Sequence, residues 1–264
     1  MIKFFRKIRQ KLLTENPPER SGSVRAGKFS KYLIYAIGEI ILVVIGILIA
    51  LQINNADTHR KETQTLHGYL RSIRNNIESD KKQIEAIIAF RDSVKFYSQK
   101  VVQLSHQNEI TLKEFLLVVH DKYNVFFDQY LEINPSGFEA LKNSGYLGMI
   151  QGSKIENLIN DYYLVYNIVN KQEKSLNDFI ENMEVLGFQE NAFTEIMQIL
   201  RMPDAEEYFA SHQDQIKTII NHPSIQGANL RGSIVGGLFN EYKKLLSIGQ
   251  QLLVEIDKIV ENQE

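Results

Sequence analysis

Hydrophobic residues are most concentrated between Tyr32 and Ile53, in the run YLIYAIGEIILVVIGILIALQI, whose one charged residue is Glu39. A helix of these 22 residues would be about 33 Å long, enough to cross a bilayer core of about 30 Å. The part from Ile40 to Leu51 has no polar side chain, which is unsuited to the surface of a soluble bundle. The pattern predicts one transmembrane helix over residues 32–54.

After the span, apolar residues recur in steps of three and four, which is the pattern of a helix that packs along one face. Asp80 and Arg91 occupy two positions where this spacing predicts an apolar residue. The stripe lasts about five heptads, and no helix-breaking residue separates it from the span, so we expect one continuous helix. Its apolar members are Leu66, Leu70, Ile73, Ile77, Ile84, Ile87, Val94 and Val101.

A less regular stretch follows. Thr111 and Glu114 have the spacing of a capping box and predict a short helix, 112–122. Residues 123–133 are rich in aromatic residues without a helical period, which favours an extended segment packed on the bundle. Residues 134–137 form a predicted turn, and a short helix over 138–143 is expected to stop near Gly145.

Helical periodicity then returns and continues to the C-terminus. Ser153 is predicted to cap a long helix that ends at Gly187, and a shorter helix is expected over 190–201. A last long helix is predicted after Pro223, in which Gly232, Gly236 and Gly237 indicate close helix–helix approach. The apolar faces of the two long helices are Ile155, Leu158, Tyr162, Val165, Val169, Leu176, Phe179 and Met183, and Leu230, Leu238, Tyr242, Leu245, Leu252, Ile256 and Ile259.

These elements predict an all-α chain in which an N-terminal transmembrane helix precedes an antiparallel helical bundle with long heptad-like helices. We find no convincing strand pair. The predicted organisation is a head over residues 1–31, a span over 32–54 and a body over 55–264.

Charge separates the head from the body. Residues 1–31 carry nine Lys or Arg against Glu15 and Glu19, whereas the whole chain has a net charge of −2. The positive-inside rule therefore predicts a cytoplasmic N-terminus and a periplasmic body. A cleaved signal peptide is the competing interpretation, but no small-x-small cleavage site follows Ala50. The acidic body argues against nucleic-acid binding, which needs clustered positive charge.

The first residues, MIKFFRKIRQKLL, predict a basic amphipathic helix. Its polar face contains Lys3, Arg6, Lys7 and Lys11, which can bind anionic lipid headgroups. The same charges can equally serve only to set the topology, and the two interpretations are compatible.

The span has one face of small and polar residues. Ala36, Gly46, Ala50 and Asn54 lie within about 60° of Glu39 around the helix. Small residues allow close helix approach, and a carboxyl group can hydrogen-bond across such a contact. We therefore expect Glu39, Gly46 and Ala50 to pack against a second copy or another membrane protein. The alternative is that Glu39 is protonated or reaches the interface without a partner.

Three segments resemble those of a known family. MIKFFRKIRQKLL and KFSKYLIYAIGEIILVVIGILIALQINN, and less closely FEALKNSGYLGMI, are similar to a family of uncharacterised single-span membrane proteins of flavobacteria and their relatives. That family usually has a tryptophan after the paired asparagines, where this chain has Ala56. The resemblance implies a Gram-negative inner-membrane protein and supplies no catalytic residues.

The sequence offers little for catalysis. It has no cysteine, which excludes disulfides and thiolate chemistry, and its six histidines lack the spacing of a helical zinc site. We therefore predict neither an enzyme nor a cofactor. Tyr162, Tyr163 and Tyr166 are candidates for a partner surface, with core packing as the alternative.

Two functions remain in competition. The body could be a structural or interaction subunit of an envelope complex, or a ligand-sensing input domain that signals through a membrane partner. An apolar pocket with convergent polar groups between the long helices would favour sensing. A filled core with an exposed aromatic patch would favour the subunit.

Overall fold

A computed structural model describes residues 25–119 and 122–261, without the side chains of residues 25–32, 34, 35 and 261. The described residues form helices and turns with no strand, which confirms the all-α prediction. Contacts divide the chain into two compact units, Met1–Lys61 and Glu62–Glu264. The predicted amphipathic helix at the N-terminus lies outside the described residues.

The described part of the first unit belongs to helix α2, Arg25–Leu104. Every side chain from Ala36 to Ala56 is exposed. By length and composition, α2 is the helix within the described ranges that could cross a membrane. It continues without a break into the second unit, as the uninterrupted periodicity predicted.

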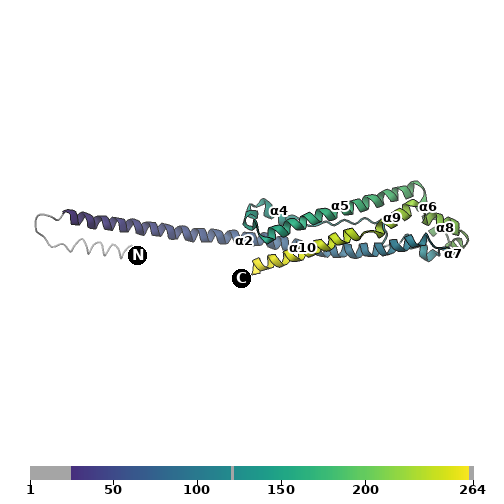
Figure 1. Cartoon of the computed structure of the whole chain (residues 1–264), viewed down its shortest axis with the longest axis horizontal. Helices are drawn as coiled ribbons and strands as arrows, with labels where there is room; N and C mark the ends of the chain where they lie inside the picture. Colours follow the sequence, from purple (N-terminus) through teal and green to yellow (C-terminus); the bar gives the residue numbers. More distant parts are fainter. Residues whose placement is uncertain (1–24, 120–121, 262–264) are drawn as a thin grey trace. The chain divides into compact units, whose positions relative to one another are not determined.

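The second unit is built on three long helices: α2 from Glu62 onward, α5 (Lys154–Gln189) and α10 (Gly236–Glu261) (Figure 1). Hydrogen bonds pair Arg74 with Asp257 and Arg91 with Tyr242, so α10 runs antiparallel to α2. Tyr162 bonds to Asp80, and Tyr242 also bonds to Glu173, which makes α5 parallel to α2. The bundle is therefore confirmed, with a long crossover between its two parallel helices.

The predicted stripe on α2 is confirmed, since all eight of its apolar residues are buried. The faces predicted for α5 and the last helix are correct except at Phe179, Leu230 and Ile259, which are exposed. On α5 the buried face passes from Leu176 to Ile180, because a straight helix drifts by about 20° per heptad.

Leu230 is exposed because the last predicted helix is in fact two. Helix α9, Pro223–Ser233, ends before Ile234 and Val235, and α10 starts at Gly236. The prediction of close helix–helix approach is correct at Gly232, where a Cβ would lie 3.0 Å from Ser98 Oγ of α2. It is wrong at Gly236, which has nothing within 4 Å of that position, and at Gly237, whose one neighbour there is the Gln172 Oε1 atom at 3.9 Å.

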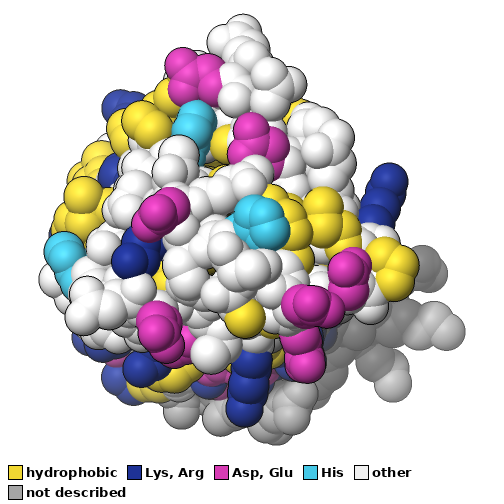
Figure 2. Space-filling view, turned by 90° about the vertical axis from the view of Figure 1, so that its right-hand side faces the viewer, with side chains coloured by type: hydrophobic (Ala, Val, Ile, Leu, Met, Phe, Trp, Pro, Cys, Tyr) yellow, Lys and Arg dark blue, Asp and Glu magenta, His cyan; other side chains and the backbone are white. Residues whose placement is uncertain are grey.

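A second, smaller core lies at the end of the unit where α2 stops. It joins Val101 and Leu104 to α3 (Leu112–Phe115), α6 (Ala192–Leu200), α7 (Ala205–Ser211) and α8 (Gln213–Ile220). Helices α7 and α8 were not predicted. Seen from this end, charged, histidine and hydrophobic side chains are interspersed with one another and with white atoms of the backbone and other side chains (Figure 2).

Helix α3 is shorter than predicted. The Thr111–Glu114 capping box is present, but the helix ends at Phe115 instead of 122. The amides of Leu117 and Val118 bond to carbonyls three residues back, and the Asn124 side chain donates to the Val118 carbonyl. These tight turns replace the expected continuation of the helix.

We name residues 124–135 the strap; it has a turn at 125–127, and 128–135 have no regular secondary structure, so it agrees in part with the extended segment predicted over 123–133. The turn predicted over 134–137 is wrong at Ser136 and Gly137, which begin the next helix. The strap bonds to Arg91 through Gln129 and to Asp80 through Asn134. These two α2 residues are about 16 Å apart along the helix, so each of the five residue steps from Gln129 to Asn134 advances about 3.3 Å, as in a strand. The chain then enters α4 (Ser136–Asn143), stops at Gly145, whose φ is +83°, and forms a 3₁₀ turn, η1 (Tyr146–Ile150).

Candidate functional site

The two polar interruptions of the α2 stripe mark a buried polar cluster. Asp80 and Arg91 are both buried, and so is Ser98, which follows Arg91 in the same register. Charged side chains are almost never fully buried unless they are paired or hydrogen-bonded. Their partners come from α5, α10 and the strap, so this cluster is where the distant segments of the second unit meet.

The larger half of the cluster contains Arg91, Glu173 and Tyr242. Arg91 Nε donates to the Tyr242 hydroxyl at 3.1 Å, and that hydroxyl donates to Glu173 Oε1. Glu173 is fully buried, and its other oxygen accepts the backbone N–H of Leu131 at 2.9 Å. Burial raises the pKa of Glu173, and the hydrogen bonds and the Arg91 charge oppose that rise.

The smaller half contains Asp80 and Tyr162. Asp80 accepts hydrogen bonds from the Asn134 backbone N–H at 3.0 Å and from the Tyr162 hydroxyl at 3.1 Å. Burial raises the pKa of Asp80, against the effect of these two donors. Burial, together with the negative charge of Asp80, also raises the pKa of the Tyr162 hydroxyl, so it remains a donor.

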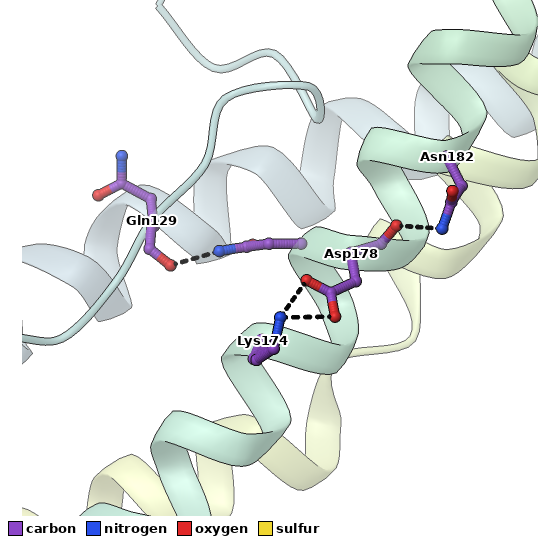
Figure 3. Close-up of polar contacts among 5 residues, drawn as sticks. Gln129, Lys174, Asp178 and Asn182 are labelled. Atoms are coloured by element: carbon purple, nitrogen blue, oxygen red, sulfur yellow. Dashed lines mark hydrogen bonds and ion pairs between the residues drawn. The ribbon is translucent and has the colours of Figure 1, made fainter.

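Both halves hold the backbone of the strap. The Gln129 carbonyl accepts from Arg91 Nη2 at 2.7 Å and from Asn177 Nδ2 at 2.9 Å. Figure 3 shows Gln129 beside α5, with the exposed Lys174–Asp178 ion pair and Asn182 on the same helix. An extended segment without a strand partner leaves backbone groups unpaired, and buried ones need hydrogen bonds. The interruptions of the heptad stripe therefore supply the strap with its partners.

The tyrosines predicted as a partner surface are mostly internal. Tyr162 is 1% exposed, so it belongs to the core and cannot contact a partner. Tyr163 is partly buried and stacks on Phe138 with centroids 4.8 Å apart. Tyr166 is also partly buried, and its hydroxyl accepts from Asn170. The core alternative is correct for Tyr162.

The residues predicted for membrane contacts lie in the first unit. Glu39, Gly46 and Ala50 are exposed, and a Cβ on Gly46 would meet nothing within 4 Å. They are free to contact a partner, and their proposed pairing stays a prediction. Lys3, Arg6, Lys7 and Lys11 lie outside the described residues.

One arrangement resembles a hydrolytic triad. His222 Nδ1 lies 2.7 Å from Ser224 Oγ, and His222 Nε2 lies 2.9 Å from Glu190 Oε2. Ser224 is 0% exposed, however, so no substrate can reach its hydroxyl. His222 also accepts the Ser224 backbone N–H, which makes the group the N-terminal cap of α9. Among the described residues, no cluster of His, Asp or Glu has the arrangement of a metal site.

The interior beside Arg91 is nearly filled. A cavity of about 10 Å³ lies between the strap, α2 and α5, lined by Phe90, Arg91, Val94, Phe127 and Asn177 among others. That volume is at the lower limit for one water molecule. Small-molecule pockets are typically about 300–1,000 Å³.

No family model, curated protein or solved structure matches this chain. The resemblance to the flavobacterial family therefore stays a prediction. Asp80 and Arg91 are irregular positions of the sequence pattern, whereas Glu173, Asn177 and Ser98 were not predicted to belong to a polar cluster. Ser98 had a signal, because it lies seven residues after Arg91 in the same stripe, whereas Glu173 and Asn177 resemble ordinary polar residues of a helix.

Proposed function

We propose that this chain is a single-span protein of the bacterial inner membrane whose helical body is an interaction subunit of an envelope complex. The N-terminus would lie in the cytoplasm and the body in the periplasm. The basic residues before the span support this orientation. The fully exposed apolar run supports the anchor, because soluble monomers rarely expose an apolar surface of that extent.

The close packing of the interior beside Arg91 is the observation that supports the proposed role of the body. The cavity beside Arg91 holds no more than one water, and the polar groups around it bond to one another and to the strap. A body without room for a ligand at this place can still bind another protein through its surface. The alternative, a ligand-sensing input domain, requires a pocket that is some thirtyfold larger.

In the membrane, the proposal places Glu39, Gly46 and Ala50 against a second copy or an unidentified membrane protein. The small residues would permit close approach, and the carboxyl group would hydrogen-bond across the contact. Lys3, Arg6, Lys7 and Lys11 would bind lipid headgroups on the cytoplasmic side. The proposal includes no catalytic step and no cofactor.

Crosslinking in native membranes, followed by purification and identification of attached proteins, tests this role. We expect a reproducible membrane or periplasmic partner in near-stoichiometric amount. Recovery of the protein alone would contradict the subunit role. A small molecule retained by the purified protein, without any partner, would favour the sensing alternative.

A further inference from the structure

The strap is held to the bundle in an unusual way. Its backbone has no ladder with another strand and instead bonds to single side chains of α2 and α5. Each bond involves a side chain from a separate helical turn. The attachment is therefore a set of side-chain contacts, of which those of Arg91 and Glu173 are joined through Tyr242, without the repeated backbone ladder of a sheet.

Few strap side chains contribute to the core. Val125, Leu131 and Ile133 are buried, whereas Phe127 and Tyr130 are 48% and 43% exposed. Phe126 is partly buried against the same core and contacts the Phe193 ring edge-on, so the twelve residues have four apolar anchors. Regions with few buried apolar contacts open at a lower free energy than the helices around them.

The polar side chains beneath the strap can keep their hydrogen bonds when the strap leaves. Arg91, Glu173, Asp80 and Asn177 are polar, and water can replace the strap as their hydrogen-bond partner. An apolar groove would lose contacts without replacement. The charged side chains in the α2 stripe therefore lower the cost of opening at this place.

A closely packed glycine lies near each end of the strap. At one end Val125 packs on Gly232 of α9. At the other end Gly137 is pressed against α2, where a Cβ would lie 2.7 Å from the backbone nitrogen of Ile73. The backbone contact at Gly137 cannot yield, so the chain is fixed just after the strap.

From these contacts we propose that residues 124–135 are a releasable strap, which leaves the groove between α2 and α5 as a unit while the three long helices stay folded. Release uncovers Arg91, Glu173 and Tyr242 together with the apolar residues around them. The form with the strap attached (closed) and the form with the strap released (open) therefore present different surfaces. A partner that binds one form shifts the population toward it.

Hydrogen exchange of the full chain in lipid nanodiscs tests the proposal. The amides of Leu131 and Asn134, which bond to Glu173 and Asp80, should exchange at least tenfold faster than core amides of α5 and α10. Their rates should be insensitive to low denaturant concentrations, as for local opening. Exchange of the strap and the helices at one common, denaturant-dependent rate would overturn the proposal.

A matched pair of variants on α5 sharpens the test. Asn177→Ala removes one donor to the Gln129 carbonyl and should speed exchange of the strap amides about fivefold, with the helix amides unchanged. Asn182→Ala is the control, because Asn182 is exposed and bonds to the Asp178 carbonyl of its own helix. Equal acceleration of strap and helices by Asn177→Ala, or none in the strap, would refute a separately opening strap.

Discussion

Arg91 shows how one buried charge is compensated in this bundle. It lies where the heptad pattern predicts an apolar residue, and it donates to both the Tyr242 hydroxyl and the Gln129 carbonyl. Its positive charge also lowers the pKa of Glu173 against the effect of burial. Buried pairs of this type contribute little net stability, yet removal of one member is costly because it leaves the other uncompensated.

Replacement of Arg91 by an apolar residue should therefore lower the free energy of unfolding more when it is made alone than when Glu173 is also replaced. We expect Arg91→Met to lower the free energy of unfolding by about 3–5 kcal/mol, measured by urea unfolding of the full chain in detergent. Adding Glu173→Gln, which keeps an acceptor for the Leu131 N–H, should recover at least about 1 kcal/mol. A double variant as unstable as the sum of the single variants would contradict this coupling.

Asp80 should make stability depend on pH. Its pKa is raised in the folded chain, so the carboxyl binds its proton more tightly there than in the unfolded chain. The free energy of unfolding is then highest below the ordinary pKa of about 4 and falls as the pH rises through the raised value. Asp80→Asn should remove this fall, which can reach about 1.4 kcal/mol per pH unit for one proton.

The measurement is urea unfolding across a pH series, with Asp92→Asn as the control, since Asp92 is an exposed carboxylate on the same helix. In the control, the free energy of unfolding should change with pH as it does in the unchanged chain. If it also changes in the same way in Asp80→Asn, the pKa of Asp80 is the same in the folded and unfolded chains. Glu173 and Glu184, whose pKa values are also raised, remain in every variant.

The periodicity of the chain predicts the long helices well, but it does not predict where they are interrupted. The α2 stripe and the Ser153 cap of α5 could be predicted because they depend on local spacing. The break at Ile234–Val235 could not, since the surrounding residues continue a helical pattern. The partners of Asp80 and Arg91 could not be predicted from local spacing either, because they lie 38 to 151 residues away along the chain.

The junction between the strap and α4 depends on one glycine. In Gly137→Ala the new Cβ would lie 2.7 Å from the Ile73 backbone nitrogen and 2.9 Å from the Ser72 carbonyl carbon. Backbone atoms of a long helix cannot move aside easily, so we expect a loss of about 1–3 kcal/mol, measured by thermal or urea unfolding. Gly148→Ala is the matched control, because nothing lies within 4 Å of its Cβ position. A loss of the same size in both variants would show that the close approach is not the cause.

For the whole molecule, the proposed function depends on which side of the membrane the body occupies. The chain has no cysteine, so a single introduced cysteine reports its own location. Glu206→Cys, an exposed position in α7, should react with a membrane-impermeant maleimide in intact spheroplasts. Labelling only after lysis would place the body in the cytoplasm and contradict the proposed orientation.

We propose that this anchored body acts through a protein partner that the span helps to bind. Quantitative crosslinking in native membranes, with Gly46→Leu compared with Gly38→Leu, measures that contact. Both glycines lie in the span with nothing within 4 Å of the added Cβ, but Gly38 is about 100° away from Glu39 around the helix. We expect Gly46→Leu to reduce the amount of crosslinked partner several-fold and Gly38→Leu to leave it unchanged. Equal recovery from both variants, or no crosslinked partner from the unchanged chain, would contradict it.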